Sequence, residues 1–298
     1  MARQTDWEFL DDRGRSATAA RTPSRLVAYI QAGATLFDHG IRPVGLFGSH
    51  HDGETADPAK AGTLPLEDIA YLGSGTRVDA EAVLDAEPDL VVGVGYGSDQ
   101  LYGLDPDTAK HIEEQVPVVV CDVGQGRSLA DVRDRFTALA RSLGAERNPS
   151  GAAELDRAEG RLRALAADAT HLTILALSPG TPESVHLARP RAWPDLRTLV
   201  ECGIGLVEPE RGPGANWSTV DWTVAASLEP DIVLADVRAN ALPVGELGGI
   251  EAWQAGAGRA RIVPWNPEAP CSHRAHARFI DTVAEAVQAS AASAASGS

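Results

Sequence analysis

One sequence pattern occurs twice in this chain, and it restricts the fold more than any other feature. The first copy is Val78–Val92 (VDAEAVLDAEPDLVV), and the second is Val220–Val233 (VDWTVAASLEPDIV). In each copy a Val-Asp pair precedes a short helical pattern, Glu-Pro-Asp ends that pattern, and an apolar run typical of a β-strand follows. Asp79 and Asp221 are predicted to cap the two helices, and a proline stops each one because it cannot donate the next helical hydrogen bond. The repeat predicts two halves of similar construction.

Size and charge exclude several classes of protein. The chain has 298 residues, which is enough for two domains with one core each. It carries 26 Lys and Arg against 42 Asp and Glu, for a formal charge of −16. Such a surface repels nucleic acid and anionic lipid, so neither is expected as a partner. Three cysteines are too few and too scattered for a disulfide scaffold or a structural zinc site.

Strand and helix patterns alternate along both halves of the chain, as in α/β proteins with parallel sheets and helices on both faces. Ala152–Ala169 is rich in strong helix formers and predicts one long, stiff helix between the halves. The predicted organisation is therefore an α/β lobe over residues 1–147, a linking helix over 148–170 and a second α/β lobe over 171–298. Ser290–Ser298 is rich in Ala, Ser and Gly and is expected to be a disordered tail.

Five segments together resemble a known family over nearly the whole chain. In order they are WEFLDDRGR…TPSRLVAYI, GIRPVGLFG, VDAEAVLDAEPDLVVG, VDWTVAASLEPDIVLAD and VPWNPEAPCSHRAHARF. Their order and spacing resemble the substrate-binding proteins of bacterial ABC importers, of the iron-siderophore and cobalamin type with a helical hinge. Ala188–Leu196 and Asn216-Trp217 look more like the iron-siderophore branch. The resemblance implies a monomeric, non-enzymatic binding protein whose ligand is a ferric siderophore, with no cofactor or resident metal.

In this family the ligand lies between the lobes, against loops that follow the sheet strands. Arginine suits anionic chelates, because its charge is permanent, and aromatic side chains provide rigid apolar walls. The same tryptophans could instead pack the lobe cores. The resemblance therefore implies that the ligand contacts Gln31, Phe47, His50, Tyr96, Arg191, Trp193, Trp217, Arg238, Trp265 and Asn266, with Gln125 nearby.

The resemblance also implies a permease partner and an extracytoplasmic location. Family members dock on the permease through a carboxylate on each lobe, and Glu81 has that place in the first lobe. The corresponding position in the second lobe is Thr223, which leaves Asp221 as the nearest carboxylate. The N-terminus, MARQTDWEFLDDRGR, contains no basic-then-apolar export signal and no lipid-acceptor cysteine. A cytoplasmic protein of the same fold that handles or senses a siderophore without a permease is the alternative.

Other chemistry has weaker support. His50, His51, Asp52 and Glu54 form the best metal-like cluster, so zinc or manganese capture stays open, as does cobalamin binding. Adjacent histidines on an extended segment point apart, which disfavours a shared metal. There is no Gly-x-Ser-x-Gly elbow and no Walker loop, and Gly93–Gly97 lacks the dinucleotide-binding spacing. An enzyme is not expected.

Overall fold

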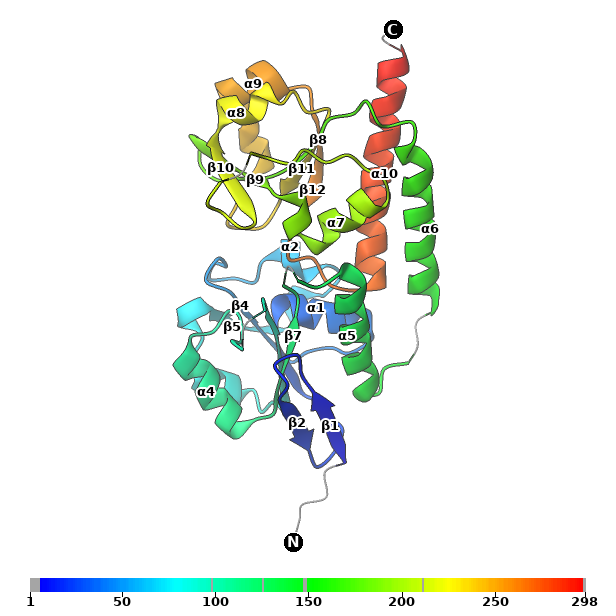
Figure 1. Cartoon of the computed structure of the whole chain (residues 1–298). Helices are drawn as coiled ribbons and strands as arrows, with labels where there is room; N and C mark the ends of the chain where they lie inside the picture. Colours follow the sequence, from blue (N-terminus) through cyan, green and yellow to red (C-terminus); the bar gives the residue numbers. More distant parts are fainter. Residues whose placement is uncertain (1–5, 98, 125, 147–148, 211, 297–298) are drawn as a thin grey trace. The chain divides into compact units, whose positions relative to one another are not determined.

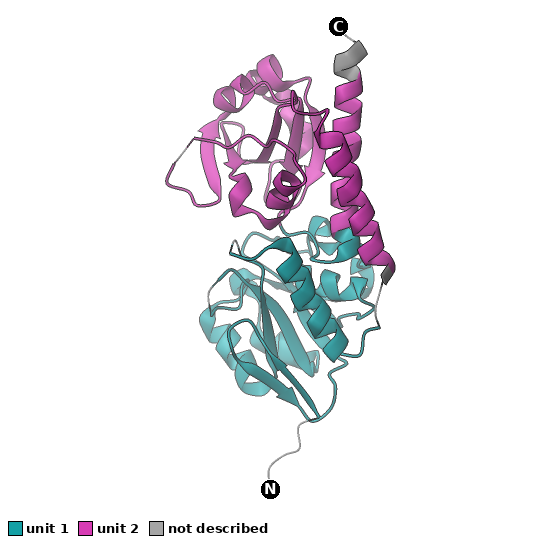
Figure 2. Ribbon diagram, turned by 45° about the vertical axis from the view of Figure 1, so that its right-hand side comes forward, with its two compact units in different colours: residues 1–149, 268–275 teal, residues 150–267, 276–298 magenta. Residues whose placement is uncertain are grey.

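The chain forms two compact units. The computed structural model describes residues 6–97, 99–124, 126–146, 149–210 and 212–296 (Figure 1). Unit 1 consists of Met1–Pro149 and Glu268–Ala275, and unit 2 consists of Ser150–Pro267 and His276–Ser298 (Figure 2). Glu268–Ala275, the return segment, therefore belongs to unit 1 although it follows most of unit 2 in the sequence. The sequence had not suggested this return.

Unit 1 is built on a parallel sheet of strand order β5-β4-β3-β6-β7. Its strands are β3 (Leu26–Tyr29), β4 (Gly45–Gly48), β5 (Ala70–Ser74), β6 (Leu90–Gly95) and β7 (Val118–Asp122). Its helices are α1 (Ile30–Asp38), α2 (Pro58–Ala61), α3 (Ala80–Asp85), α4 (Pro106–Gln115) and α5 (Leu129–Ser142). Two 3-10 helices, η1 (Leu66–Asp68) and η2 (Gly75–Arg77), flank β5.

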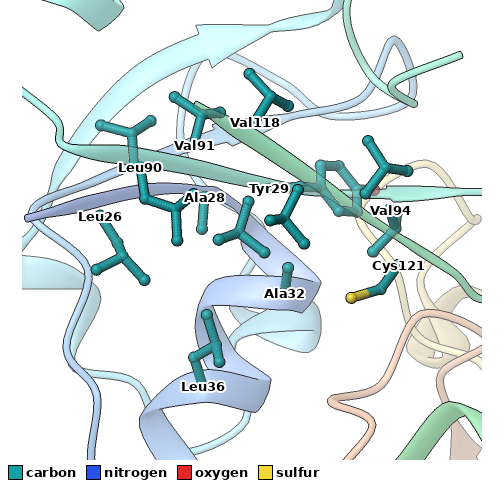
Figure 3. Close-up of a cluster of buried hydrophobic side chains, with 14 of the residues drawn as sticks. Leu26, Ala28, Tyr29, Ala32, Leu36, Leu90, Val91, Val94, Val118 and Cys121 are labelled. Carbon is teal, nitrogen blue, oxygen red and sulfur yellow. The ribbon is translucent and has the colours of Figure 1, made fainter. Parts of the chain in front are cut away.

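The core of unit 1 lies where α1 packs on the central strands. Leu26 and Ala28 of β3 and Leu90 of β6 are buried against Ala32 and Leu36 of α1 (Figure 3). The central strands are nearly continuous apolar runs, as expected where helices cover both faces of a parallel sheet. An antiparallel hairpin of β1 (Trp7–Leu10) and β2 (Ser16–Ala19) precedes the sheet. Asp11–Arg15 (DDRGR) forms the loop of this hairpin, whose two strands were not predicted.

Unit 2 contains a mixed sheet of strand order β10-β9-β8-β11-β12. Its strands are β8 (Ile174–Pro179), β9 (Ser184–Ala188), β10 (Trp217–Asp221), β11 (Ile232–Asp236) and β12 (Arg261–Trp265). β8, β11 and β12 are parallel, but β9 is antiparallel to β8, and β10 is antiparallel to β9. The predicted parallel sheet is therefore present in β8, β11 and β12, and β9 and β10 add antiparallel strands that were not predicted. The turn between β8 and β9 is too short for the crossover that a parallel pair needs, so the chain makes a hairpin.

Helices cover both faces of the unit 2 sheet. They are α6 (Pro149–Ala166), α7 (Pro194–Glu201), α8 (Trp222–Ser227), α9 (Glu251–Ala257) and α10 (His273–Ser296), with 3-10 helices η3 (Pro190–Ala192) and η4 (Val244–Gly249). Ile174 and Ala176 of β8 pack in one core with α6, α7 and α10, whereas Leu175 and Leu177 pack in a second core with α8 and α9. This alternation follows from the two-residue period of a strand.

The long helices α6 and α10 lie side by side in unit 2 (Figures 1 and 2). Arg161 of α6 lies 3.5 Å from the Asp281 carboxylate of α10 and 3.0 Å from the side-chain oxygen of Gln288. The predicted helix over Ala152–Ala169 is confirmed as α6. The predicted disordered tail is wrong from Ser290 to Ser296, because α10 continues through these residues.

The predicted helix boundaries agree with the structure where they rest on capping chemistry. Asp79 accepts a hydrogen bond from the backbone N–H of Glu81, and Asp221 accepts one from Val224, so both N-caps are confirmed. Gly40 and Gly203 follow α1 and α7 with φ of 86° and 95°. These left-handed conformations suit glycine at the end of a helix.

The repeated Glu-Pro-Asp performs the same task in both units. α3 and α8 end at Asp85 and Ser227, and Glu87 and Glu229, the residues before the two prolines, have φ of 49° and 46°, which is incompatible with a continued helix. The Asp89 carboxylate then accepts the backbone N–H of Arg25, just before β3, at 2.7 Å. Asp231 accepts the corresponding N–H before β8 at 2.8 Å. The motif thus ends a helix and fixes the start of the neighbouring strand, which explains its recurrence.

Candidate ligand-binding surfaces

Five aromatic rings meet where the strands of unit 1 end, and we call them the aromatic stack. Tyr29 ends β3, Phe47 lies near the end of β4, and Tyr96 follows β6. The Tyr102 ring makes an edge contact with Tyr29 at 5.6 Å and with Tyr96 at 4.7 Å, and His50 lies 6.5 Å from Tyr102. Tyr29 and Phe47 are fully buried, whereas Tyr96 and His50 are exposed. The stack therefore runs from the core of unit 1 to its surface.

Parallel strand direction and one glycine produce this arrangement. The carboxyl ends of parallel strands meet at one edge of the sheet, which brings the three strand ends together. Gly103 has a φ of 91°, and a Cβ there would lie 3.0 Å from the Gly48 carbonyl oxygen and 3.4 Å from the Tyr29 ring. Glycine is thus needed for Tyr102 to reach the stack. Tyr102 was missed from the sequence, where the Tyr-Gly pair in a loop was its only signal.

A buried ion network lies next to the aromatic stack. The Lys60 ammonium is 2.7 Å from the Asp52 carboxylate and 3.0 Å from the Glu268 carboxylate, and all three side chains are almost fully buried. The Tyr29 hydroxyl donates a hydrogen bond to the Glu268 carboxylate. Burial together with the Glu268 charge raises the pKa of Tyr29 well above its usual value. Because Lys60 pairs with both Asp52 and Glu268, it connects the loop after β4 to the return segment.

Asp52 also shapes the loop that carries His50. One of its carboxylate oxygens accepts the backbone N–H of Ser49 at 2.6 Å and the Ser49 hydroxyl at 3.1 Å. The Ser74 hydroxyl donates to the Asp52 carbonyl at 3.1 Å. Because Asp52 is turned inward, it cannot join the exposed His50 and His51 around a metal ion. Within the described ranges, no group of three His, Cys, Asp or Glu side chains is arranged to hold a metal.

Unit 2 contains a cluster of three tryptophans, Trp193, Trp217 and Trp265. Their ring centroids are 4.9 Å, 5.7 Å and 5.8 Å apart in the three pairs. Trp265 ends β12 and is 1 % exposed, Trp193 is 9 % exposed, and Trp217 at the start of β10 is half-buried. The Trp193 indole N–H donates to the Asn216 carbonyl at 3.3 Å. Trp217 is therefore the member of the cluster that a ligand can reach most easily.

Asp195 supports this tryptophan cluster. Its carboxylate accepts the Trp265 indole N–H at 2.5 Å, and burial raises the pKa of Asp195 to about 6. The amide of asparagine can accept the same hydrogen bond without a charge.

We expect Asp195 to make folding stability depend on pH. The pKa of Asp195 is higher in the folded than in the unfolded chain. The contribution of Asp195 to the free energy of unfolding therefore falls as the pH rises from about 4 to about 6, by up to roughly 3 kcal/mol. Asp195→Asn should lose this contribution. Urea unfolding at pH 4 and pH 7 measures it: the variant should gain stability relative to the original protein at the higher pH. An equal difference at both pH values would contradict the prediction.

The two predicted ligand arginines are in different environments. Arg238 forms a fork on Asp236, with Nη2 at 2.7 Å and Nε at 3.0 Å from its two carboxylate oxygens. Asp236 is fully buried and also accepts the Ser178 hydroxyl at 2.8 Å. Arg191 is exposed on η3, two residues before Trp193. Among the described residues, no carboxylate forms an ion pair with Arg191.

The remaining predicted ligand residues are placed as follows. Gln31 was predicted to lie in a loop but belongs to the first turn of α1, where it is buried and donates to the Ala269 carbonyl at 3.0 Å. Phe47 is a core residue within β4 rather than a loop residue. Asn266 is half-buried directly after β12. Gln125 lies outside the described residues.

The predicted docking carboxylates are on the surfaces of their units. Glu81 of α3 has a side chain that is 71 % exposed, and its carboxylate lies 3.1 Å from the imidazole of His111. Asp221 caps α8, so one of its oxygens is engaged by the Val224 N–H. No helix in the described ranges is both long and apolar enough to span a membrane.

Two surface cavities lie away from the predicted ligand residues. They have volumes of about 310 and 350 Å³ and lie beside the β1–β2 hairpin and α4 of unit 1. Both are lined by Arg13, Arg15 and Glu113, and the Glu113 carboxylate forms an ion pair with each arginine. The charges of these cavities are thus paired within the protein.

Comparison with solved structures identifies the fold. DesE, a ferric-siderophore receptor protein from Streptomyces coelicolor, superimposes with a TM-score of 0.85 over 95 % of this chain and 98 % of its own, at 23 % identity. FhuD from Vibrio cholerae, a siderophore-binding protein with Fe³⁺-Desferal bound, superimposes with a TM-score of 0.64 over 90 % of this chain and 98 % of its own, at 19 % identity. The haem-binding protein HmuT superimposes with a TM-score of 0.66 over 96 % of this chain and 91 % of its own, at 16 % identity. No family model and no curated protein sequence matches this chain.

These matches confirm the predicted fold. The chain has the fold of the siderophore- and haem-binding proteins, with two α/β units and the helix α6 where a long helix was predicted. Such low sequence identities establish the fold alone. The ligand has to be argued from the residues.

Proposed function

We propose that this protein binds a ferric siderophore, or a similar bulky iron chelate, outside the cytoplasm and delivers it to an ABC permease. The observation that carries the proposal is the agreement with a ferric-siderophore receptor along nearly the whole of both chains. The aromatic stack and the tryptophan cluster support it, because flat rigid rings suit a bulky chelate with apolar linkers. Binding by such preformed surfaces requires no chemical step.

We infer from their exposure which of these residues contact the chelate. In unit 1 they are Tyr96, Tyr102 and His50, which form the exposed part of the aromatic stack. In unit 2 they are Trp217, Arg191 and Asn266, which are exposed or half-buried. Trp193 and Trp265 pack directly against Trp217, whereas Phe47 packs against the buried Tyr29.

Tryptophan fluorescence tests the proposal. The purified protein is titrated with ferrioxamine, ferrichrome, a ferric catecholate, haem, cobalamin and zinc. One iron chelate should quench the emission saturably at sub-micromolar concentration, because the tryptophan cluster would lie close to the iron. Trp217→Phe should reduce the quenching, whereas Trp253→Phe, in the core beneath α8 and α9, should not. A response to zinc alone, or to no compound, would contradict the proposal.

Permease docking is the second part of the proposal, and Glu81 is the residue that tests it. Glu81→Lys reverses an exposed charge, so we expect iron-chelate uptake through the cognate permease to fall at least about tenfold, which corresponds to roughly 1.4 kcal/mol. The affinity of the purified protein for the chelate should not change.

Glu114→Lys is the matched control for Glu81→Lys, because Glu114 is an exposed carboxylate of α4 that carries no predicted docking role. Uptake by this control should stay close to that of the original protein. Equal losses of uptake from both variants would contradict a specific role of Glu81.

A further inference from the structure

Three side chains of α1 hold the return segment of unit 1. They are spaced by four and three residues, so they share one face of the helix. Each makes one hydrogen bond to the segment: Gln31 to the Ala269 carbonyl at 3.0 Å, Thr35 to the Cys271 N–H at 2.8 Å, and Asp38 to the Ser272 hydroxyl at 2.5 Å. Because α10 begins directly after these residues, the same bonds fix the start of that helix.

The ligand loop, which we define as residues 49–53, carries His50 and is shaped by Asp52. The Asp52 carboxylate accepts the backbone N–H and the hydroxyl of the first residue of the loop, and its carbonyl accepts the Ser74 hydroxyl at 3.1 Å. A Cβ at Gly75 would lie 2.8 Å from the His50 Cα, so the loop also packs closely on η2. A large movement of His50 therefore requires this arrangement to open.

The short helix α2 and the glycine after it contact both segments. Lys60 of α2 pairs with Asp52 of the ligand loop at 2.7 Å and with Glu268 of the return segment at 3.0 Å. Gly62 has a φ of 59°, and a Cβ there would lie 2.8 Å from the Pro270 Cγ. The return segment thus packs on the end of α2 as well as pairing with its lysine.

Burial makes the two ion pairs of Lys60 depend on each other. The Lys60 side chain is fully buried, and the attraction between charges is much stronger away from water than in it. If the return segment opened, water would reach Lys60 and weaken its attraction to Asp52. If the ligand loop opened, water would weaken the attraction to Glu268 in the same way. Each segment therefore favours the closed state of the other.

We propose that α2 couples the ligand loop to the return segment, so that a chelate bound against His50 also stabilises the return segment and the start of α10. The inference rests on the proposed function for its ligand, whereas the coupling is a property of the free protein. Coupling of this kind is reciprocal, so a change that loosens the return segment should also loosen the ligand loop.

Hydrogen exchange of the free protein tests the coupling. Thr35→Val keeps the shape of a buried side chain but removes the acceptor of the Cys271 N–H. Exchange of the return-segment amides should rise at least about fivefold, and exchange of the ligand-loop amides should rise with it at least about threefold. Thr198→Val is the matched control, because Thr198 is a buried helix threonine of unit 2 that also donates to the carbonyl four residues earlier. It should leave both segments unchanged.

Lys60→Met separates coupling through α2 from a general loosening of unit 1. In this background Thr35→Val should still speed exchange of the return segment, but it should not speed exchange of the ligand loop any further. If Lys60→Met alone folds poorly, Lys60→Met combined with Glu268→Gln takes its place. A ligand loop that does not respond to Thr35→Val, or that responds equally in both backgrounds, would overturn the inference.

Chelate binding supplies the second part of the test, because a ligand slows only the exchange that occurs through openings of its site. The probe is ferrioxamine, ferrichrome or the ferric catecholate, whichever binds in the fluorescence titration. Saturation should slow exchange of the return segment at least about threefold in the original protein but not in Lys60→Met, and it should leave the β1–β2 hairpin unchanged.

The outcomes separate the inference from the function on which it rests. A bound chelate that leaves the return segment unprotected, or protection that persists in Lys60→Met, would overturn the inference and leave a chelate-binding function. Binding of no chelate by the folded protein would overturn the proposed function, and exchange of the free protein would then decide the coupling.

Discussion

Lys60→Met is expected to lower the free energy of unfolding by about 3–5 kcal/mol, because it leaves two buried carboxylates without their cation. Lys60 is fully buried between Asp52 and Glu268. Methionine has a similar length and no charge, so the loss reports the electrostatic change more than a change in packing. Urea unfolding monitored by circular dichroism measures the loss.

Two further variants make this expectation specific. Lys110→Met removes an exposed lysine that lies 3.9 Å from Glu114 on the same helix, and it should change stability by less than about 1 kcal/mol. Adding Glu268→Gln to Lys60→Met should recover part of the loss, because one unpaired carboxylate is removed. Similar effects of Lys60→Met and Lys110→Met would show that the network contributes little to unit 1.

The Lys60 network connects two segments whose relation the sequence does not reveal. Asp52 belongs to the loop that carries His50, whereas Glu268 begins the return segment. The return segment is held further by the Thr35 hydroxyl, which accepts the Cys271 N–H at 2.8 Å, and by a 2.5 Å hydrogen bond from Ser272 to Asp38. Loss of Lys60 is therefore expected to loosen both the ligand loop and the return segment.

Local chemistry made much of the fold predictable. Asp79 and Asp221 cap their helices as expected, and Gly40 and Gly203 end theirs, because these signals depend only on nearby backbone groups. The antiparallel strands β9 and β10 were missed. β10 follows a loop rich in Pro and Gly, and its pairing with β9 is a long-range interaction. Leu206, in the segment before that loop, forms an isolated parallel bridge with Ile174 outside the named strands.

The candidate surfaces were less predictable than the fold. Strand ends can be identified from the sequence, and the structure places Tyr96 and His50, which follow two of them, in one aromatic stack. Burial cannot be identified in this way, so the prediction that Gln31 and Phe47 lie in loops fails, because both are buried inside unit 1. The partner of a charged residue is equally hidden, because pairing depends on tertiary placement. That is why Arg191 and Arg238 looked alike in the sequence.

Arg238→Met is expected to destabilise the protein by about 3–5 kcal/mol, whereas Arg191→Met should change stability by less than about 0.5 kcal/mol. Arg238 is the cation that pairs with Asp236, which is fully buried at the end of β11, so its removal leaves a buried charge uncompensated. Arg191 is exposed and has no carboxylate partner among the described residues. Urea unfolding of the two variants in the absence of ligand measures the difference.

The affinities of the same two variants should follow the opposite order. If Arg191 contacts the chelate, Arg191→Met should weaken binding by about tenfold or more while the protein remains stable. Arg238→Met combined with Asp236→Asn should restore much of the stability, because charge and counter-charge are removed together, and the double variant should bind the chelate within a few fold of the original protein. A double variant that is stable but does not bind would show that Arg238 contacts the ligand.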